Sequence, residues 1–175
     1  LSNLKIVSII KAHGYYKGTG LPLAYTAFSF TLFEDWDGAY NFAKLALAKD
    51  DHHEPVLEAR KRSMCYYMVM HWKESFHDCL EPSLTTFDMA MSNADIAYAF
   101  YAINAYSSFY LHCGLALDPL RHAMRRYMEL FTDYGQEYVL NIYRAYVQLV
   151  LNLMGMSDDP SILNDHALNK HDHLA

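Results

Sequence analysis

The sequence predicts an all-α fold in which helices pair in an antiparallel arrangement. Hydrophobic residues make up 53% of the 175 residues and charged residues only 19%, a balance that supports a packed core and argues against disorder. The seven Gly and five Pro fall mostly between long stretches of helical periodicity, as expected for helices joined by short turns. Small residues alternate with large aromatic ones in these stretches, which favours close packing of neighbouring helices.

The first four helices are indicated by their end signals. Gly14 is a typical residue after a helix C-terminus, and Pro22 and Pro55 suit the first turns of the second and fourth helices. Asp35 or Asp37 can cap the third helix. Apolar side chains recur at intervals of three and four residues within each segment. These helices are expected over residues 2–13, 22–33, 37–47 and 55–72.

The last four helices have similar boundaries. Pro82 lies near the first turns of the fifth helix or kinks it. Ser92 and Asn93 interrupt the periodicity before the sixth helix. Asp118 followed by Pro119 predicts a side-chain cap and a proline at the first position of the seventh helix. These helices are expected over residues 75–91, 94–112, 118–134 and 136–154.

The predicted helices form four pairs of similar length. The pairs begin about 35 to 43 residues apart, a spacing close to that of tetratricopeptide and related helical repeats. The motifs that resemble the second helix of one tetratricopeptide repeat and the first helix of the next are Ala24-x-x-Ala27-Phe28, Asp35-Trp36-Asp37-x-Ala39-Tyr40 and Ala43-x-x-Ala46-Leu47. The resemblance implies a tetratricopeptide-like right-handed α-α superhelix over residues 1–155, followed by a polar tail or linker over residues 156–175.

Several further blocks occur in a characteristic order along residues 24–155. They are Gly38-x-Tyr40-x-Phe42-x-x-Leu45-Ala46-Leu47, His71-Trp72-Lys73-Glu74, Leu80-Glu81-Pro82, residues 98–114, Tyr143-Arg144-Ala145 and Leu151-Asn152-Leu153-Met154-Gly155. In this order they resemble the tetratricopeptide-like helical region of large bacterial multi-domain sensor kinases. In that family, serine/threonine-kinase-like and ATPase-like segments precede the helices, and GAF and histidine-kinase domains follow them.

The resemblance implies a non-catalytic role in signal transduction. The helical segment would act as a protein-interaction or signal-relay scaffold, with other domains of the same polypeptide as its partners and the nucleotide chemistry outside it. The sequence starts directly in helical pattern without a Met, so a piece of a longer chain is expected. A homodimer is a further expected arrangement, because the end faces of a helical repeat array are apolar.

Charge and cysteine content narrow the classes of partner and compartment. The formal net charge of −6 argues against nucleic acid as a partner, because binding phosphates requires a basic excess. The longest apolar run is interrupted by Gln148 and Asn152 and is too short to span a membrane. Cys65, Cys79 and Cys113 are odd in number and widely spaced, which favours reduced thiols in the cytoplasm.

No pattern in the sequence predicts a catalytic residue, a cofactor or a metal site. The glycines at 14, 18 and 20 do not form a phosphate-binding loop. The two local histidine clusters fall in a predicted loop and in the predicted tail, where nothing fixes the geometry that a metal needs. They comprise His52 and His53, and His166, His171 and His173.

Basic residues provide the main candidate for a binding surface. Arg60 and Arg62 lie in the fourth predicted helix, and Arg121 and Arg125 lie four residues apart in the seventh. Arginine forks hold carboxylates well, and tetratricopeptide grooves bind extended peptides. These arginines are therefore candidates for partner binding, with a solvated helix surface as the competing interpretation.

Aromatic residues provide the second candidate surface. The chain has 15 Tyr and nine Met, and Tyr98 and Tyr101 are spaced so that they can share one side of the sixth helix. Such a face either contacts a partner or belongs to the core with its hydroxyls at the rim. The alternative function is a helical sensor that binds a small molecule in an aromatic pocket, and an enclosed pocket lined by tyrosines would favour it.

Overall fold

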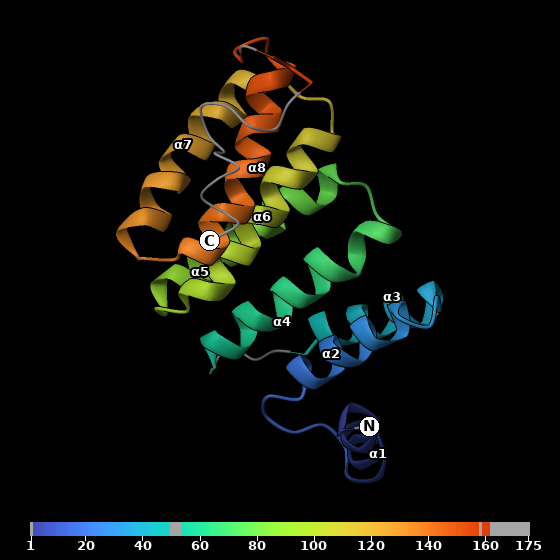
Figure 1. The fold of residues 1–175 in the computed structure, drawn as a ribbon. Coiled ribbons are helices and arrows are strands. Elements are labelled where there is room, and N and C mark those ends of the chain that lie inside the picture. Colours follow the sequence, from blue (N-terminus) through green and yellow to red (C-terminus); the bar gives the residue numbers. More distant parts are fainter. Residues whose placement is uncertain (1, 50–53, 158, 162–175) are drawn as a thin grey trace. The chain divides into compact units, whose positions relative to one another are not determined.

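The computed structural model describes residues 2–49, 54–157 and 159–161, and all regular structure in these ranges is helical (Figure 1). No strand occurs among them, so the predicted all-α class is confirmed. The helices are α1 (Ser2–His13), α2 (Gly20–Thr31), α3 (Trp36–Leu47), α4 (Pro55–Met68), α5 (Leu80–Ser92), α6 (Ile96–His112), α7 (Leu117–Asp133) and α8 (Glu137–Leu153), with short 3₁₀ helices η1 (Met70–Trp72) and η2 (His77–Cys79) between α4 and α5.

Most helix ends follow the local signals in the sequence. Asp35 caps α3 by accepting a hydrogen bond from the Gly38 backbone N–H at 2.9 Å. Pro55 opens α4, and Pro82 lies in the first turn of α5. Gly14 follows α1 with φ of +83°, a left-handed conformation that glycine adopts without steric cost.

Several predicted helix boundaries are wrong. The fourth helix ends at Met68 instead of 72, and α5 begins at Leu80 instead of 75, because the 3₁₀ helices η1 and η2 occupy the segment between them. The helix α2 begins at Gly20 instead of 22. Asp118 does not cap α7, because the helix already begins at Leu117 and the Asp118 carboxylate instead accepts from Arg121 at 2.8 Å. Ala94 does not begin α6, because it lies between the helices with φ of +55°. The starts of α6 and α7 thus lie within two residues of the predicted ones, a difference that is common at helix ends.

The chain divides into two compact units, residues 1–106 and residues 107–175, which we call the N-terminal and C-terminal units. The boundary lies within α6, so its first part belongs to one unit and its last part to the other. Of the predicted tail, the structure describes only residues 156, 157 and 159–161.

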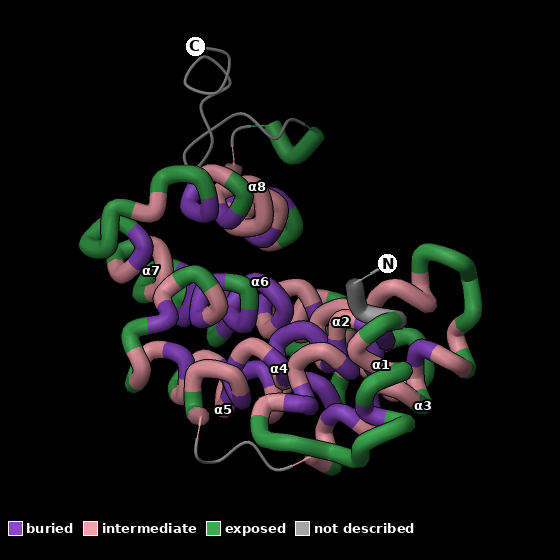
Figure 2. Tube along the Cα trace, turned by 90° about the horizontal axis from the view of Figure 1, so that it is seen from below, coloured by how far each residue is buried: buried purple, intermediate pink, exposed green. Residues whose placement is uncertain are grey.

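Alanines line the core of the N-terminal unit. The helix α2 packs against both α3 and α4, and α4 packs against α5. Phe30 of α2 stacks on Phe42 of α3 with 5.1 Å between ring centroids. Figure 2 shows the buried stretches of α4 and α6. The small alanine side chains let the helix backbones approach one another, and large aromatic rings fill the space that remains between the helices. The fully buried alanines are Ala24, Ala27, Ala39, Ala43, Ala46, Ala59, Ala90, Ala99 and Ala105.

Both tryptophans of the chain meet in the N-terminal unit. Trp36 at the start of α3 and Trp72 in η1 have ring centroids 4.6 Å apart. The residues that directly follow the two tryptophans in the sequence, Lys73 and Asp37, form an ion pair at 2.8 Å. Trp72 is nevertheless 56% exposed, so the ring lies at the surface and does not plug a gap in the core.

Polar side chains contribute to the core of the C-terminal unit. Tyr143 of α8 is fully buried, lies edge-on to Phe131 of α7 at 5.0 Å, and shares a hydrogen bond of 2.8 Å with Ser107. The two polar residues that interrupt the apolar run of α8 are buried and bonded to each other, because Gln148 donates to Asn152 at 2.8 Å. None of the described helices is long and apolar enough to cross a membrane.

Candidate functional site

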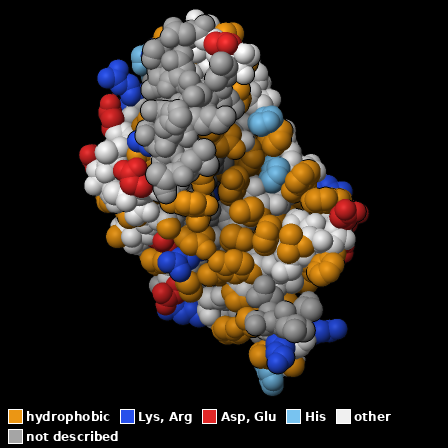
Figure 3. Space-filling view, viewed as in Figure 1, with side chains coloured by type: hydrophobic (Ala, Val, Ile, Leu, Met, Phe, Trp, Pro, Cys, Tyr) orange, Lys and Arg blue, Asp and Glu red, His pale blue; other side chains and the backbone are white. Residues whose placement is uncertain are grey.

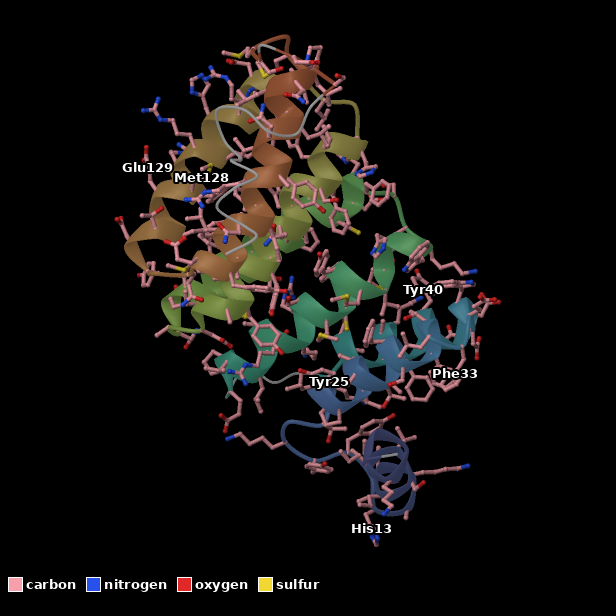
Figure 4. All side chains as sticks on the ribbon, in the orientation of Figure 1. His13, Tyr25, Phe33, Tyr40, Met128 and Glu129 are labelled. Carbon is pink, nitrogen blue, oxygen red and sulfur yellow. The ribbon has the colours of Figure 1, made fainter. Side chains whose placement is uncertain are left out.

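The C-terminal unit carries an open groove between α7 and α8, which we call the arginine groove. It has a volume of about 380 Å³. Two of the predicted binding residues, Arg121 and Arg125, line it from α7. Figure 4 labels Met128 and Glu129 one turn further along the same helix. The remaining lining residues are Thr132, Val147 and Leu151. The groove thus combines an apolar floor with two guanidinium groups.

The two arginines of the groove differ in how firmly they are held. Arg121 donates to the Asp118 carboxylate through both Nε and Nη2, at 3.2 and 2.8 Å. This hydrogen bonding holds the pKa of Asp118 below its usual value. Arg125 is 79% exposed and lies 3.4 Å from Glu129, a surface pair in which water competes strongly. Arg125 is therefore the more available of the two for a ligand carboxylate.

Arg60 and Tyr98, both predicted as binding residues, lie together in the N-terminal unit. Arg60 of α4 donates from Nε to the carboxylate of Asp95 at 2.7 Å, and its guanidinium lies 5.1 Å from the ring centroid of Tyr98. Asp95 is buried, so this pair is better shielded from water than the pairs in the arginine groove. The Tyr98 hydroxyl shares a hydrogen bond of 2.8 Å with the hydroxyl of Tyr25.

Tyr25 and Tyr98 border a small cavity between α2, α4 and α6, which we call the tyrosine pocket. Its volume is about 210 Å³. Figure 3 shows hydrophobic side chains gathered over α2 and α4. Tyr25, labelled in Figure 4, enters from α2, and Tyr98 and Tyr101 enter from α6 with their rings edge to face at 5.7 Å. The other lining residues, all from α4, are Ser63, Met64, Tyr67 and Met68.

Arg62 joins neither site. Its guanidinium lies 5.6 Å from the ring centroid of Tyr66 and 3.9 Å from the carboxylate of Glu58, both on its own helix. Lys61 is almost entirely buried and forms an ion pair with Glu58 at 2.5 Å. It also donates to the backbone carbonyl of Lys49. The basic run in α4 is therefore not one solvated surface, because consecutive residues of a helix point in different directions.

Among the residues that the structure describes, ionisable side chains meet in pairs such as Lys61 with Glu58 and Arg60 with Asp95. No group of three or more His, Cys, Asp or Glu is arranged there to hold a metal ion. The first histidine cluster, His52 and His53, and the second, His166, His171 and His173, lie outside the described residues. Burial raises the pKa of the Cys65 thiol to about 12, which makes this sulfur a poor nucleophile at neutral pH.

Comparison of the chain with protein-family models, curated proteins and solved structures finds no significant match. The resemblance to the helical region of sensor kinases therefore rests on the sequence blocks alone.

Sequence reasoning missed two residues that organise the tyrosine pocket. Asp95 was expected inside the sixth helix but lies directly before α6, and Tyr25 was placed in the second predicted helix without a role. The distance between partners explains the omission: 35 residues separate Asp95 from Arg60, and 73 separate Tyr25 from Tyr98. An acidic residue directly before a helix is a recognisable cap signal, but it does not indicate which arginine it meets.

Proposed function

We propose that this chain is a non-catalytic protein-interaction and signal-relay scaffold whose arginine groove holds an acidic segment of a partner protein. The observation that carries the proposal is the pairing of Arg121 and Arg125 above an apolar floor formed by residues such as Val147 and Leu151. A peptide that alternates carboxylates with apolar side chains complements both features. The sensor-kinase resemblance adds the expectation that this partner belongs to the same cytoplasmic polypeptide.

The packing of the N-terminal unit supports a tetratricopeptide-like arrangement as part of this proposal. The helix α2 contacts the next helix, α3, and also the next but one, α4. Contacts of this kind are what stacked helix pairs produce, because each pair buries one face against its successor. The right-handed superhelix itself remains part of the proposal.

The charges near the groove favour a peptide over nucleic acid. Asp118 and Glu129 lie beside the two arginines, so an extended chain of phosphates would meet negative charge as well as positive charge. The net charge of −6 also disfavours the binding of nucleic acid. A single peptide carboxylate, in contrast, needs only Arg125, whose exposed pair with Glu129 is weak and easily exchanged.

Peptide binding in solution tests this proposal. The probe is a labelled peptide with leucine and phenylalanine between glutamates, compared by fluorescence anisotropy with versions in which every glutamate is replaced by glutamine or by lysine. We expect the acidic peptide to bind most tightly and its affinity to fall as salt is raised. The double variant Arg121→Glu with Arg125→Glu should weaken binding at least about tenfold.

Arg126→Glu is the matched control. Arg126 is exposed on the same helix, next to Arg125, but it does not line the groove. We expect this variant to bind like the unaltered protein because consecutive helical residues project in different directions. Equal binding of the acidic and glutamine peptides, or equal loss in Arg126→Glu, would contradict the proposal.

The full-length polypeptide tests the relay role, because it should contain kinase-like and ATPase-like segments.

A further inference from the structure

The size of the tyrosine pocket sets the size of molecule that it can hold. Its volume of about 210 Å³ exceeds the roughly 150 Å³ of a protein cavity that binds benzene. It is smaller than the pockets of about 300 Å³ and more that hold drug-sized ligands. One ring, or two fused rings, therefore matches the pocket.

The lining of the pocket selects for aromatic character. Four tyrosine rings and two methionine side chains surround the space. Tyr98 and Tyr101 make an edge-to-face contact at 5.7 Å, one of the geometries that aromatic rings prefer. Methionine sulfur is polarisable and makes favourable contacts with ring edges. A planar ring gains more from these neighbours than a saturated ring of equal size.

The electrostatics of the pocket select for a neutral molecule. The described lining residues include no Asp, Glu, Lys, Arg or His. The nearest guanidinium, that of Arg60, is already held by Asp95 at 2.7 Å and lies 5.1 Å from the Tyr98 ring. An ionic ligand would have to leave water without gaining a counter-ion, which is costly in a partly buried site.

The hydroxyl pair of Tyr25 and Tyr98 supplies a polar anchor. One of its two protons is used in the 2.8 Å bond between the oxygens, and the other proton and the remaining lone pairs can be directed at a ligand. Burial, and next to it the hydrogen bond with Tyr25, raises the pKa of Tyr98, so its hydroxyl stays protonated at neutral pH.

From this combination of volume, aromatic lining and neutral polar anchor, we propose that the tyrosine pocket is a binding site for a neutral aromatic molecule of one or two fused rings that carries one hydrogen-bonding group. The site lies wholly in the N-terminal unit and does not depend on the arginine groove. It would give the chain a small-molecule sensing function in addition to the proposed protein interaction.

Methyl NMR of the 175-residue chain tests the proposal directly. With ¹³C-methyl methionine, the titration of phenol and indole should shift the Met64 and Met68 signals through ring currents. Met91 and Met128 do not line the pocket and serve as internal controls. We expect saturable shifts with a dissociation constant on the order of 0.1 mM for indole, as for a small ligand with few atoms. Cyclohexanol and benzoate test the aromatic and neutral requirements, and each should bind at least about tenfold more weakly.

Three variants link the shifts to the pocket. Tyr101→Ala removes a ring from the exposed rim, where a change is tolerated by the fold, and should weaken indole binding about fivefold or more. Tyr138→Ala makes the same change at an exposed tyrosine of α8 and should leave binding unchanged. Tyr98→Phe keeps the ring but loses the anchor, and should weaken binding about two- to tenfold.

Each outcome of the titrations either supports or overturns the proposed binding site. Saturable shifts confined to Met64 and Met68, lost in Tyr101→Ala and kept in Tyr138→Ala, support the site. No shift up to the solubility limit of indole overturns it. Cyclohexanol binding as well as phenol would overturn the aromatic class, and benzoate binding as well as phenol would overturn the requirement for neutrality.

Discussion

The hydroxyl oxygens of Tyr25 and Tyr98 lie 2.8 Å apart although 73 residues separate the two tyrosines in the chain. Tyr25 belongs to α2 and Tyr98 to α6, so this single bond joins two helices of the N-terminal unit that α3, α4 and α5 separate in the sequence. Contacts of such long range are formed only when the helices between them are in place. The bond is therefore a sensitive measure of the complete fold of this unit.

Removal of either hydroxyl should lower the stability of the N-terminal unit. We expect Tyr25→Phe and Tyr98→Phe each to lower the free energy of unfolding by about 1 kcal/mol, and the double variant to lose little more than one single variant, because only one bond is broken. Urea unfolding curves measure these changes. Tyr138→Phe, at a position 76% exposed, should have no effect, and fully additive losses would contradict the shared bond.

The buried ion pair in α4 should be costly to break from one side. The Lys61 side chain is 1% exposed and lies 2.5 Å from the Glu58 carboxylate, so Lys61→Met leaves a buried carboxylate without its main partner. We expect a loss of about 3 kcal/mol in the free energy of unfolding, and partial recovery when Glu58→Leu is added. Lys11→Met, at an exposed position of α1, is the control. A single variant as stable as this control would contradict the expectation.

Cys65 and Cys113 should differ in reactivity. Burial raises the pKa of Cys65 to about 12, so at pH 8 only about one thiol in ten thousand is ionised, and this fraction rises as the pH approaches 12. Cys113 is partly exposed, although burial also raises its pKa. Alkylation at pH 8 followed by mass spectrometry should modify Cys113 first and Cys65 only after urea is added. Faster native labelling of Cys65 would contradict its burial.

The Asp35 cap of α3 should cancel the gain in stability that usually follows when a helical glycine is replaced by alanine. A Cβ atom at Gly38 would lie 2.5 Å from the Asp35 carboxylate oxygen that lies closest to it. Asp35→Ala should cost about 1 kcal/mol, and adding Gly38→Ala to it should restore about 0.5 to 1 kcal/mol through helix propensity. In the unaltered background, Gly38→Ala should gain nothing, because the methyl group displaces the cap. Thermal unfolding distinguishes the two backgrounds, and an equal gain in both would refute the coupling.

Local chemistry could be predicted from the sequence, whereas pairing across the fold could not. The Asp35 cap and the helix stop at Gly14 depend on residues within one turn, so residue type alone indicates them. Asp118 was misjudged because its carboxylate binds Arg121 and the helix starts one residue earlier. The placement of Lys61 in the interior follows from tertiary packing that no local pattern encodes.

In the candidate sites, too, residues on one helix could be predicted from the sequence, whereas contributions from other helices could not. The four-residue spacing of Arg121 and Arg125 predicted one shared helix face, and both residues line the arginine groove. Tyr98 and Tyr101 likewise share a pocket through their spacing on α6. The contribution of Tyr25 from α2 depends on how α2, α4 and α6 stack, which required coordinates.

The contact between Trp36 and Trp72 makes intrinsic fluorescence a reporter of one half of the molecule. These are the only two tryptophans in the chain, and both precede residue 107, so their emission follows the melting of the N-terminal unit and is silent about α7 and α8. Far-ultraviolet circular dichroism, in contrast, sums the helices of both units. Superimposable curves from the two probes would identify one cooperative transition, and separated midpoints would show that the halves melt independently.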